Sequence, residues 1–272
     1  MKKEKTRYDF GRNWNEFSQQ LSNDSIHLAD EGLKKLVIDL TGERFMDIGS
    51  GSGLHSLSAL RQGAKSVYCF DYDEDSVATT KTVLSTYAKE QKWQVRRGDI
   101  LKEKLSNTDV EQFDVVYSWG VLHHTGDMWL AIDNASSFVR DGGRFVIALY
   151  IKTYFCGFWK IEKWFYSRYR WVRPWLKYPF AFFTLLAQML RKGKMPHQFV
   201  REYKQVRGMN FMHDIDDWLG GYPYESVQHE EIVKYMRERG FVLEKSFNTK
   251  RPIGVFGSGC GEWVFRKTDV SN

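Results

Sequence analysis

The chain has few of the residues that build disulfide frameworks or metal clusters. It contains 3 cysteines in 272 residues, namely Cys69, Cys156 and Cys260, and they lie far apart in the sequence. Their spacing matches no zinc site, and their odd number leaves no complete set of disulfides. We therefore expect a reducing, cytoplasmic environment and no metal centre.

Long apolar runs are also missing. The apolar run at residues 178–190 is too short to cross a bilayer, and no apolar segment follows the charged residues 1–6. We expect no signal peptide and no membrane span. No Gly-Lys-Ser or Gly-Lys-Thr follows a glycine-rich turn, which excludes a P-loop nucleotide site.

A glycine-rich turn is the most informative feature that is present. A predicted strand at residues 44–48 ends in Asp47-Ile48 and is followed by Gly49, Gly51 and Gly53, with a helical pattern from residue 54. Glycine permits positive φ and lets a ligand approach the backbone closely. The N-terminus of the following helix offers unpaired N–H groups. This combination predicts a nucleotide-like ligand.

Strand and helix patterns alternate after this turn. Strands are predicted at residues 66–71, 93–100, 113–119 and 144–150, with helices at residues 54–62, 75–90 and 128–139. Such alternation predicts an α/β fold with a doubly wound, mostly parallel sheet. Ligands in these sheets bind beyond the carboxyl ends of the strands. The polar or aromatic residues at those ends are Asp47, Asp71, Asp99, Ser118 and Trp119.

Residues 44–150 resemble the class I S-adenosylmethionine-dependent methyltransferases, nearest to the ubiquinone/menaquinone-biosynthesis-like group. The resemblance rests on Asp47 to Gly53, Asp71, Gly98-Asp99-Ile100, Ser118 to His124 and the turn before the fifth strand. It implies a seven-stranded Rossmann-like sheet that closes with a helix at residues 229–239 and strands at 241–249 and 261–267. A nicotinamide dehydrogenase is disfavoured, because its glycines follow G-x-G-x-x-G and it usually lacks an acid in the place of Asp47.

The resemblance implies a role for each residue at the cofactor, S-adenosylmethionine, whose product is S-adenosylhomocysteine. Asp47 would accept from the ammonium group, Asp71 from both ribose hydroxyls and Asp99 from the adenine amino group. Tyr72 and Trp119 would cover rings or the sulfonium, which an aromatic face attracts. The expected cofactor-binding residues are Asp47, Gly49, Ser50, Gly51, Gly53, Asp71, Tyr72, Asp99, Ile100, Ser118 and Trp119.

A basic and aromatic segment follows the fifth strand. Residues 151–208 hold thirteen Lys and Arg against two acids, a net charge of +11, whereas the whole chain carries +6. We expect a helical lid over the carboxyl ends of the strands. Three interpretations stay open: a packed cap with solvated cations, a surface for an anionic bilayer, and a field that attracts an anionic substrate. No RNA-binding module is recognisable, so nucleic acid is not an expected partner.

The chain divides into an N-terminal helical extension (1–40), a cofactor-binding core (41–150), a lid (151–226) and the closing helix and strands (227–272). In the extension, an apolar face at Ile26, Ala29 and Leu33 predicts a helix. Trp14 either shields the cofactor and substrate or docks on the sheet. The oligomeric state is left open.

Two clusters could serve the acceptor. His123 and His124 follow the fourth strand, and an imidazole can take a proton from a hydroxyl at neutral pH, so His124 is the preferred general base. The second cluster contains His213 and Asp217, an imidazole and a carboxylate that could together act as the general base. The expected substrate-binding residues are Trp14, Tyr222 and Tyr224.

The predicted function is O-methylation of a small or carrier-linked metabolite. An anionic metabolite would be compatible with the basic lid. The alternatives are a methyltransferase of quinone-like or glycolipid substrates in peripheral contact with the inner membrane surface, an RNA methyltransferase, and a non-catalytic module that retains the cofactor.

Overall fold

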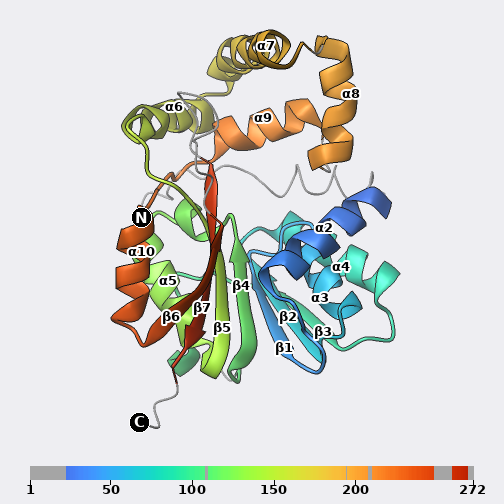
Figure 1. Ribbon diagram of the computed structural model, residues 1–272, viewed down its shortest axis with the longest axis vertical. Helices are drawn as coiled ribbons and strands as arrows, with labels where there is room; N and C mark the ends of the chain where they lie inside the picture. The colour runs from blue at the N-terminus through green and yellow to red at the C-terminus, as the bar shows by residue number, and fades with distance from the viewer. Residues whose placement is uncertain (1–22, 108–109, 194, 208–209, 248–258, 269–272) are drawn as a thin grey trace.

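The computed structural model describes residues 23–107, 110–193, 195–207, 210–247 and 259–268. Its centre is a seven-stranded sheet in the order β3-β2-β1-β4-β5-β7-β6, in which β7 runs opposite to its neighbours (Figure 1). This confirms the predicted doubly wound, mostly parallel sheet. The strands are β1 (Arg44–Ile48), β2 (Ser66–Asp71), β3 (Trp93–Arg97), β4 (Phe113–Trp119), β5 (Val139–Tyr150), β6 (Phe241–Phe247) and β7 (Cys260–Lys267).

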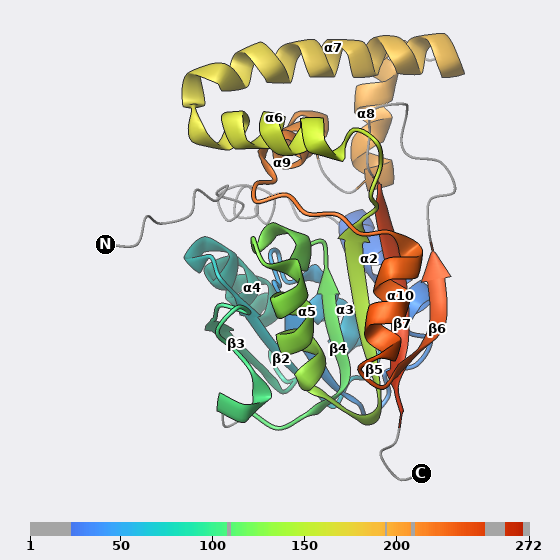
Figure 2. The ribbon, with the colours of Figure 1, turned by 90° about the vertical axis from the view of Figure 1, so that its left-hand side faces the viewer.

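Helices cover both faces of the sheet. One face carries α2 (Asn23–Leu36), α3 (Leu54–Arg61) and α4 (Glu74–Tyr87), and the other carries α5 (Met128–Ser137) and α10 (His229–Arg237) (Figures 1 and 2). Alternate residues of each strand feed two separate cores. In β1, Phe45 packs in the core under α2 to α4, while its neighbour Met46 packs in the core under α5 and α10.

Several predicted boundaries were wrong by a few residues. The third strand ends at Arg97 instead of residue 100, because the chain turns at Asp99, whose carbonyl accepts from Lys102 N. The helix predicted from residue 75 begins at Glu74, since Asp73 caps it by accepting from Ser76 N. The fifth strand begins at Val139, five residues early. The expected strand at 241–249 is described to residue 247.

Between β5 and α10 the chain forms the lid (residues 151–226). It consists of α6 (Cys156–Arg168), the short η3 (Arg170–Val172), α7 (Arg173–Lys192), α8 (Pro196–Arg207) and α9 (Phe211–Gly220). The lid stands beyond the carboxyl ends of β4 and β5, with α7 farthest from the sheet (Figures 1 and 2). It has a small core of its own around Tyr166, Phe211 and Leu219. Across the described ranges, no helix combines the length and apolarity that a membrane span requires.

The N-terminal extension is represented by α2. Its predicted apolar face is confirmed, since Ile26, Ala29 and Leu33 are buried against the core under α3 and α4. The lid helix α8 also contacts α2, so that the lid rests on this helix as well as on the sheet. Trp14 lies outside the described residues.

Candidate functional site

The glycine turn after β1 has little space around it. Gly49, Gly51 and Gly53 all have positive φ, of 78°, 53° and 76°. A methyl group at Gly49 would lie 2.5 Å from Val121 Cγ2, and one at Gly53 would lie 3.0 Å from the Thr80 backbone. Glycine is therefore required here both for conformation and for close approach.

A helix and a strand hold this turn from behind. The Thr80 hydroxyl of α4 donates to Gly51 O at 3.1 Å and lies 3.0 Å from Ser50 Oγ. The Ser118 hydroxyl of β4 is buried and donates to Ile48 O at 3.0 Å. Ser118 thus supports the turn, and the amides of the turn are fixed relative to β1 and β4.

Two carboxylates lie beside the turn, one buried and one half-buried. Asp47 is 2% exposed and accepts from Ser56 Oγ at 2.6 Å. Asp71 accepts from Gly51 N and from Asp73 N, both at 3.0 Å. Burial raises the pKa of Asp47 to about 7 and raises that of Asp71. Among the described residues no cationic side chain pairs with either carboxylate, so the site favours a cationic ligand.

The end of β3 lies next to Asp71. Gly98 N donates to Asp71 O at 2.9 Å, and the following Asp99 accepts from Leu101 N and lies 3.4 Å from Lys102 Nζ. Ile100 is buried, and its carbonyl accepts from Asn134. Tyr72, in contrast, is 42% exposed. The structure therefore brings Asp47, the glycine turn, Asp71 and Asp99 to one edge of the sheet.

Trp119 is tied to groups that the sequence analysis missed. Its indole N–H donates to Glu262 of β7 at 2.9 Å, and Glu262 also accepts from Lys35 of α2 at 2.7 Å. The ring of His55, in the first turn of α3, lies 6.2 Å from the Trp119 ring and 5.1 Å from that of Tyr117. These contacts join segments far apart in the sequence, which no local pattern indicates.

His123 and His124 lie under the lid against Tyr150, the last residue of β5. The His123 ring is 4.1 Å from Tyr150 and 4.3 Å from His124. His124 Nδ1 donates to Pro223 O at 2.8 Å, which places the lone pair of the neutral ring on Nε2. Burial lowers the pKa of both histidines, that of His124 to about 4. Both rings are therefore neutral at pH 7.

Lid residues complete this cluster. The buried ring of Tyr224 lies 5.3 Å from Tyr150. Lys163 of α6 is fully buried, with Nζ 4.1 Å from the Trp218 ring and 5.6 Å from the Tyr224 ring. Its ammonium, like both carboxylate oxygens of buried Glu162, has no hydrogen-bond partner in the described part of the chain. Burial lowers the pKa of Lys163 and raises that of Glu162.

Glu162 and Lys163 were also missed by the sequence analysis. Aromatic residues surround them on every side of α6, so the pattern does not show which face of the helix is buried. Tyr150 is likewise part of the cluster, although the sequence marked it only as the end of a strand. Burial raises its pKa, as do the nearby Asp217 and Asp214.

The other predicted lid residues divide between two places. Asp217, on α9, is close enough to Tyr150 to influence its pKa, and α9 also carries His213. Gly221 packs directly on the His124 ring, since a methyl group there would lie 2.6 Å from His124 Cε1. Tyr222 instead lines a hollow against α6 with Lys160, Ile161, Trp164 and Phe165. Tyr224 therefore joins the cluster and Tyr222 does not.

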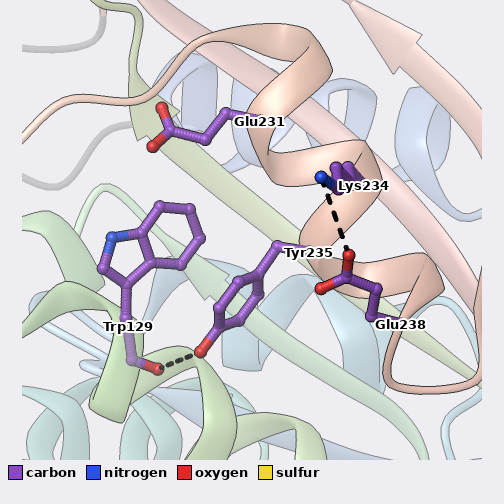
Figure 3. Close-up of a pocket in the computed structure, with 5 residues that line it drawn as sticks. All are labelled: Trp129, Glu231, Lys234, Tyr235 and Glu238. Carbon is purple, nitrogen blue, oxygen red and sulfur yellow. Dashed lines mark hydrogen bonds and ion pairs between the residues drawn. The ribbon is translucent and has the colours of Figure 1, made fainter.

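Another hollow, between α5 and α10, is unrelated to these groups. It is lined by Trp129, Glu231, Lys234, Tyr235 and Glu238 (Figure 3). Its polar atoms bond to one another: Tyr235 donates to Trp129 O at 3.4 Å, and Lys234 pairs with Glu238 at 4.0 Å. No group of three His, Cys, Asp or Glu within the described ranges is arranged to hold a metal ion.

Comparison with known proteins agrees with this geometry. Residues 46–145 match the sequence profile of a family described as "Methyltransferase domain". A ubiquinone biosynthesis O-methyltransferase of Rhizobium etli is 33% identical over 114 residues, which cover 42% of this chain and 44% of the relative. The chain thus spans less than half the length of this curated relative.

Solved structures show the same fold. Magnesium protoporphyrin IX methyltransferase from Synechocystis PCC 6803, with bound SAH, superposes with a TM-score of 0.54 at 16% identity, covering 90% of this chain and 84% of that one. An S-adenosylmethionine-dependent methyltransferase from Mesorhizobium loti gives a TM-score of 0.53 at 15% identity, covering 87% and 96%. These findings confirm the predicted Rossmann-like methyltransferase fold, and residues 46–145 match a methyltransferase domain. The ubiquinone/menaquinone-like grouping stays a prediction.

The tight turn can be tested with a matched pair of glycine substitutions. Gly42→Ala places a side chain at a φ of 76° with nothing within 4 Å, whereas Gly49→Ala adds the approach to Val121. We expect Gly42→Ala to lower the free energy of unfolding by about 1–2 kcal/mol, and Gly49→Ala by about 1–3 kcal/mol more. Denaturant unfolding measures both, and equal losses would contradict the close approach.

Burial of His55 predicts a pH effect. Burial lowers its pKa to about 4, from about 6.5 in the unfolded chain, while the charge of Glu262 acts weakly against this. Below pH 6.5 the unfolded chain binds more protons than the folded chain. The contribution of His55 to the free energy of unfolding is therefore present above pH 6.5 and is lost as pH falls towards 4. Between pH 7 and pH 5 the free energy of unfolding of the wild type should fall by about 1–2 kcal/mol more than that of His55→Gln. An equal loss in the wild type and in His55→Gln would contradict this effect.

Proposed function

We propose that this protein transfers a methyl group from S-adenosylmethionine to a hydroxyl of a small or carrier-linked acceptor beneath the lid. The observation that carries the proposal is the pair of carboxylates, buried Asp47 and half-buried Asp71, beside a rigid glycine turn and without a cationic partner among the described residues. An amino-acid ammonium and a sulfonium would supply the missing positive charge.

The residues at the turn fit the cofactor. Each oxygen of Asp71 accepts one backbone N–H, which leaves a second acceptor position on each for the two ribose hydroxyls. Asp47 is the proposed partner of the ammonium group, whose charge would restore the ionised form that burial disfavours. Asp99 and the backbone of Ile100 remain the proposed contacts to the adenine, and Tyr72 and Trp119 the proposed covers. When bound, S-adenosylmethionine supplies an activated methyl group.

On the acceptor side, His124 is the proposed general base. Its Nδ1–H bond to Pro223 O fixes the ring, so that Nε2 can receive the hydroxyl proton as the oxygen becomes a nucleophile. A pKa of about 4 keeps the ring unprotonated throughout the neutral range. His123, adjacent and buried, is the second choice, and His213 with Asp217 on α9 is the third.

Lys163 and Glu162 support an acceptor that carries charge or several polar groups. Both are buried under the lid with unpaired polar atoms, and such burial is costly until a partner arrives. We propose that Lys163 meets an anionic or strongly polar oxygen of the acceptor. Tyr224, in the same cluster, is the proposed lid residue that contacts the acceptor.

A second candidate is a lipophilic acceptor, quinone-like or glycolipid, reached at a membrane surface. It is favoured by the exposed aromatic rings of α6 and α7. The likeness to a ubiquinone biosynthesis O-methyltransferase agrees with hydroxyl methylation of such a compound. The two candidates share the cofactor site and differ in the acceptor.

Transfer of a labelled methyl group into a cell lysate tests the proposal. After incubation with labelled S-adenosylmethionine, the lysate is separated into small-molecule, lipid, protein and nucleic-acid fractions. Label in the small-molecule or lipid fraction, stable to conditions that cleave methyl esters, supports ether formation at a hydroxyl. Bound S-adenosylhomocysteine with no label in any fraction would contradict methyl transfer, and label in RNA would identify another acceptor class.

Substitution of Asp71 tests the cofactor contacts. Asp71→Asn keeps the shape but removes the charge and one acceptor, and a charge-assisted hydrogen bond is worth about 1.5–3 kcal/mol. We expect S-adenosylhomocysteine to bind about 10- to 100-fold more weakly by calorimetry. Glu74→Gln, which alters the neighbouring exposed carboxylate that pairs with Arg97, should bind normally. Unchanged affinity in Asp71→Asn would refute the ribose contact.

Substitution of His124 tests the base. In His124→Gln the side-chain amide can still donate to Pro223 O, but no proton acceptor of imidazole type remains. Turnover in the labelled fraction should fall about 100-fold or more, while the affinity for S-adenosylhomocysteine stays as in the wild type. His27→Gln provides the control, because the His27 side chain is exposed on α2. Full turnover of His124→Gln at saturating acceptor would exclude this residue as the base.

A further inference from the structure

The outer side of the lid exposes large apolar side chains that nothing in the described structure covers. The side chains of Trp171, Trp175, Tyr178 and Phe182 are each between 61% and 76% exposed. In a globular protein, side chains of this size are normally at least half buried, and contiguous apolar patches mark interaction sites.

The spacing places these rings on one face of α7. Trp175, Tyr178 and Phe182 are three and four residues apart, which aligns them along the helix, and Trp171 precedes them by one turn. The opposite face of α7 is occupied, since Leu176 and Phe180 pack on the lid core. α7 therefore has two apolar faces, and the protein uses one of them.

We call these four residues the outer lid face: Trp171, Trp175, Tyr178 and Phe182. Because α7 is the part of the molecule farthest from the sheet, a large partner can reach it without meeting the core (Figure 2).

The charges around the outer lid face have one sign. Residues 151–193 contain a single carboxylate, Glu162, and that residue is buried. The cations Arg168 and Arg170 are exposed at the end of α6 and in the turn before α7. The face thus presents rings and positive charges with no exposed acid among them.

We propose that the outer lid face lies on the surface of an anionic lipid bilayer. Trp and Tyr rings settle at the level of the headgroups, Phe gains from the acyl boundary, and Arg pairs with anionic lipids. A second copy of this chain fits less well, since it would bring like charges together.

This docking would place the enzyme in a defined orientation. The bilayer would lie against the outer side of α7, and the cluster of His124, Tyr150 and Lys163 would lie on the inner side of the same lid. An acceptor with a polar head and a lipid tail would then span the lid from one side to the other. The inference concerns binding only, so it stands or falls independently of the proposed methyl transfer.

Vesicle co-sedimentation tests the proposal with the full chain. The probes are vesicles of phosphatidylcholine alone and vesicles of three parts phosphatidylcholine to one part phosphatidylglycerol, at low and high salt. We expect binding to the anionic vesicles, weaker at high salt, and little binding to the neutral ones. The double variant Trp175→Glu/Phe182→Glu should bind at least about tenfold more weakly, because it puts two acids in the contact.

A matched double variant controls for added charge and lost apolar surface. Tyr87 and Val242 are 51% and 56% exposed and lie on the catalytic core, away from the lid. Tyr87→Glu/Val242→Glu should bind vesicles like the wild type. Both double variants should bind S-adenosylhomocysteine normally, which shows that they are folded.

Three results would overturn the proposal. They are no binding of the wild type to anionic vesicles, equal binding by the lid variant and the wild type, and a change of oligomeric state in the lid variant without any vesicle binding. The last would identify the outer lid face as a contact between copies. Loss of methyl transfer with vesicle binding intact would instead count against the proposed function alone.

Discussion

The candidate site depends on the carboxylate of Asp71. It accepts a hydrogen bond from the glycine turn at Gly51 and another from Asp73, at the start of α4. These bonds hold two loops, from two neighbouring strands, at one position at the edge of the sheet. The carboxylate is half-buried, and desolvation raises its pKa, so the same group that organises the protein backbone also favours positive charge in the ligand.

Much of the sheet could be predicted from the sequence, because strand and helix periods are local properties. The first five strands, the glycine turn and the acids at the strand ends follow from patterns within a few residues of one another. Boundaries shifted where side chains decide them, as at Asp73, whose cap starts α4 one residue early.

The acceptor side of the site was only partly predictable. His124 was identified from its place after a strand, yet Lys163, Glu162 and Tyr150 were not, because their burial depends on how α6 packs against α9 and Tyr224. Likewise, Tyr222 and Tyr224 look equivalent in sequence, but Tyr222 lines the hollow against α6 and Tyr224 packs on Tyr150. Contacts made across the lid are set by tertiary packing, to which hydrophobic periodicity gives no access.

The contacts of Glu262 determine how much of the chain the candidate site needs. Through one carboxylate it links Lys35, near the start of the described chain, to Trp119 at the end of β4, and it lies itself on the last strand. The stretch that resembles other methyltransferases, residues 46–145, contains neither Lys35 nor Glu262. Residues 46–145 are therefore not a self-sufficient unit. The Trp119 indole beside the ligand site is held by residues on both sides of this segment. A fragment that contained only this segment would lose those contacts.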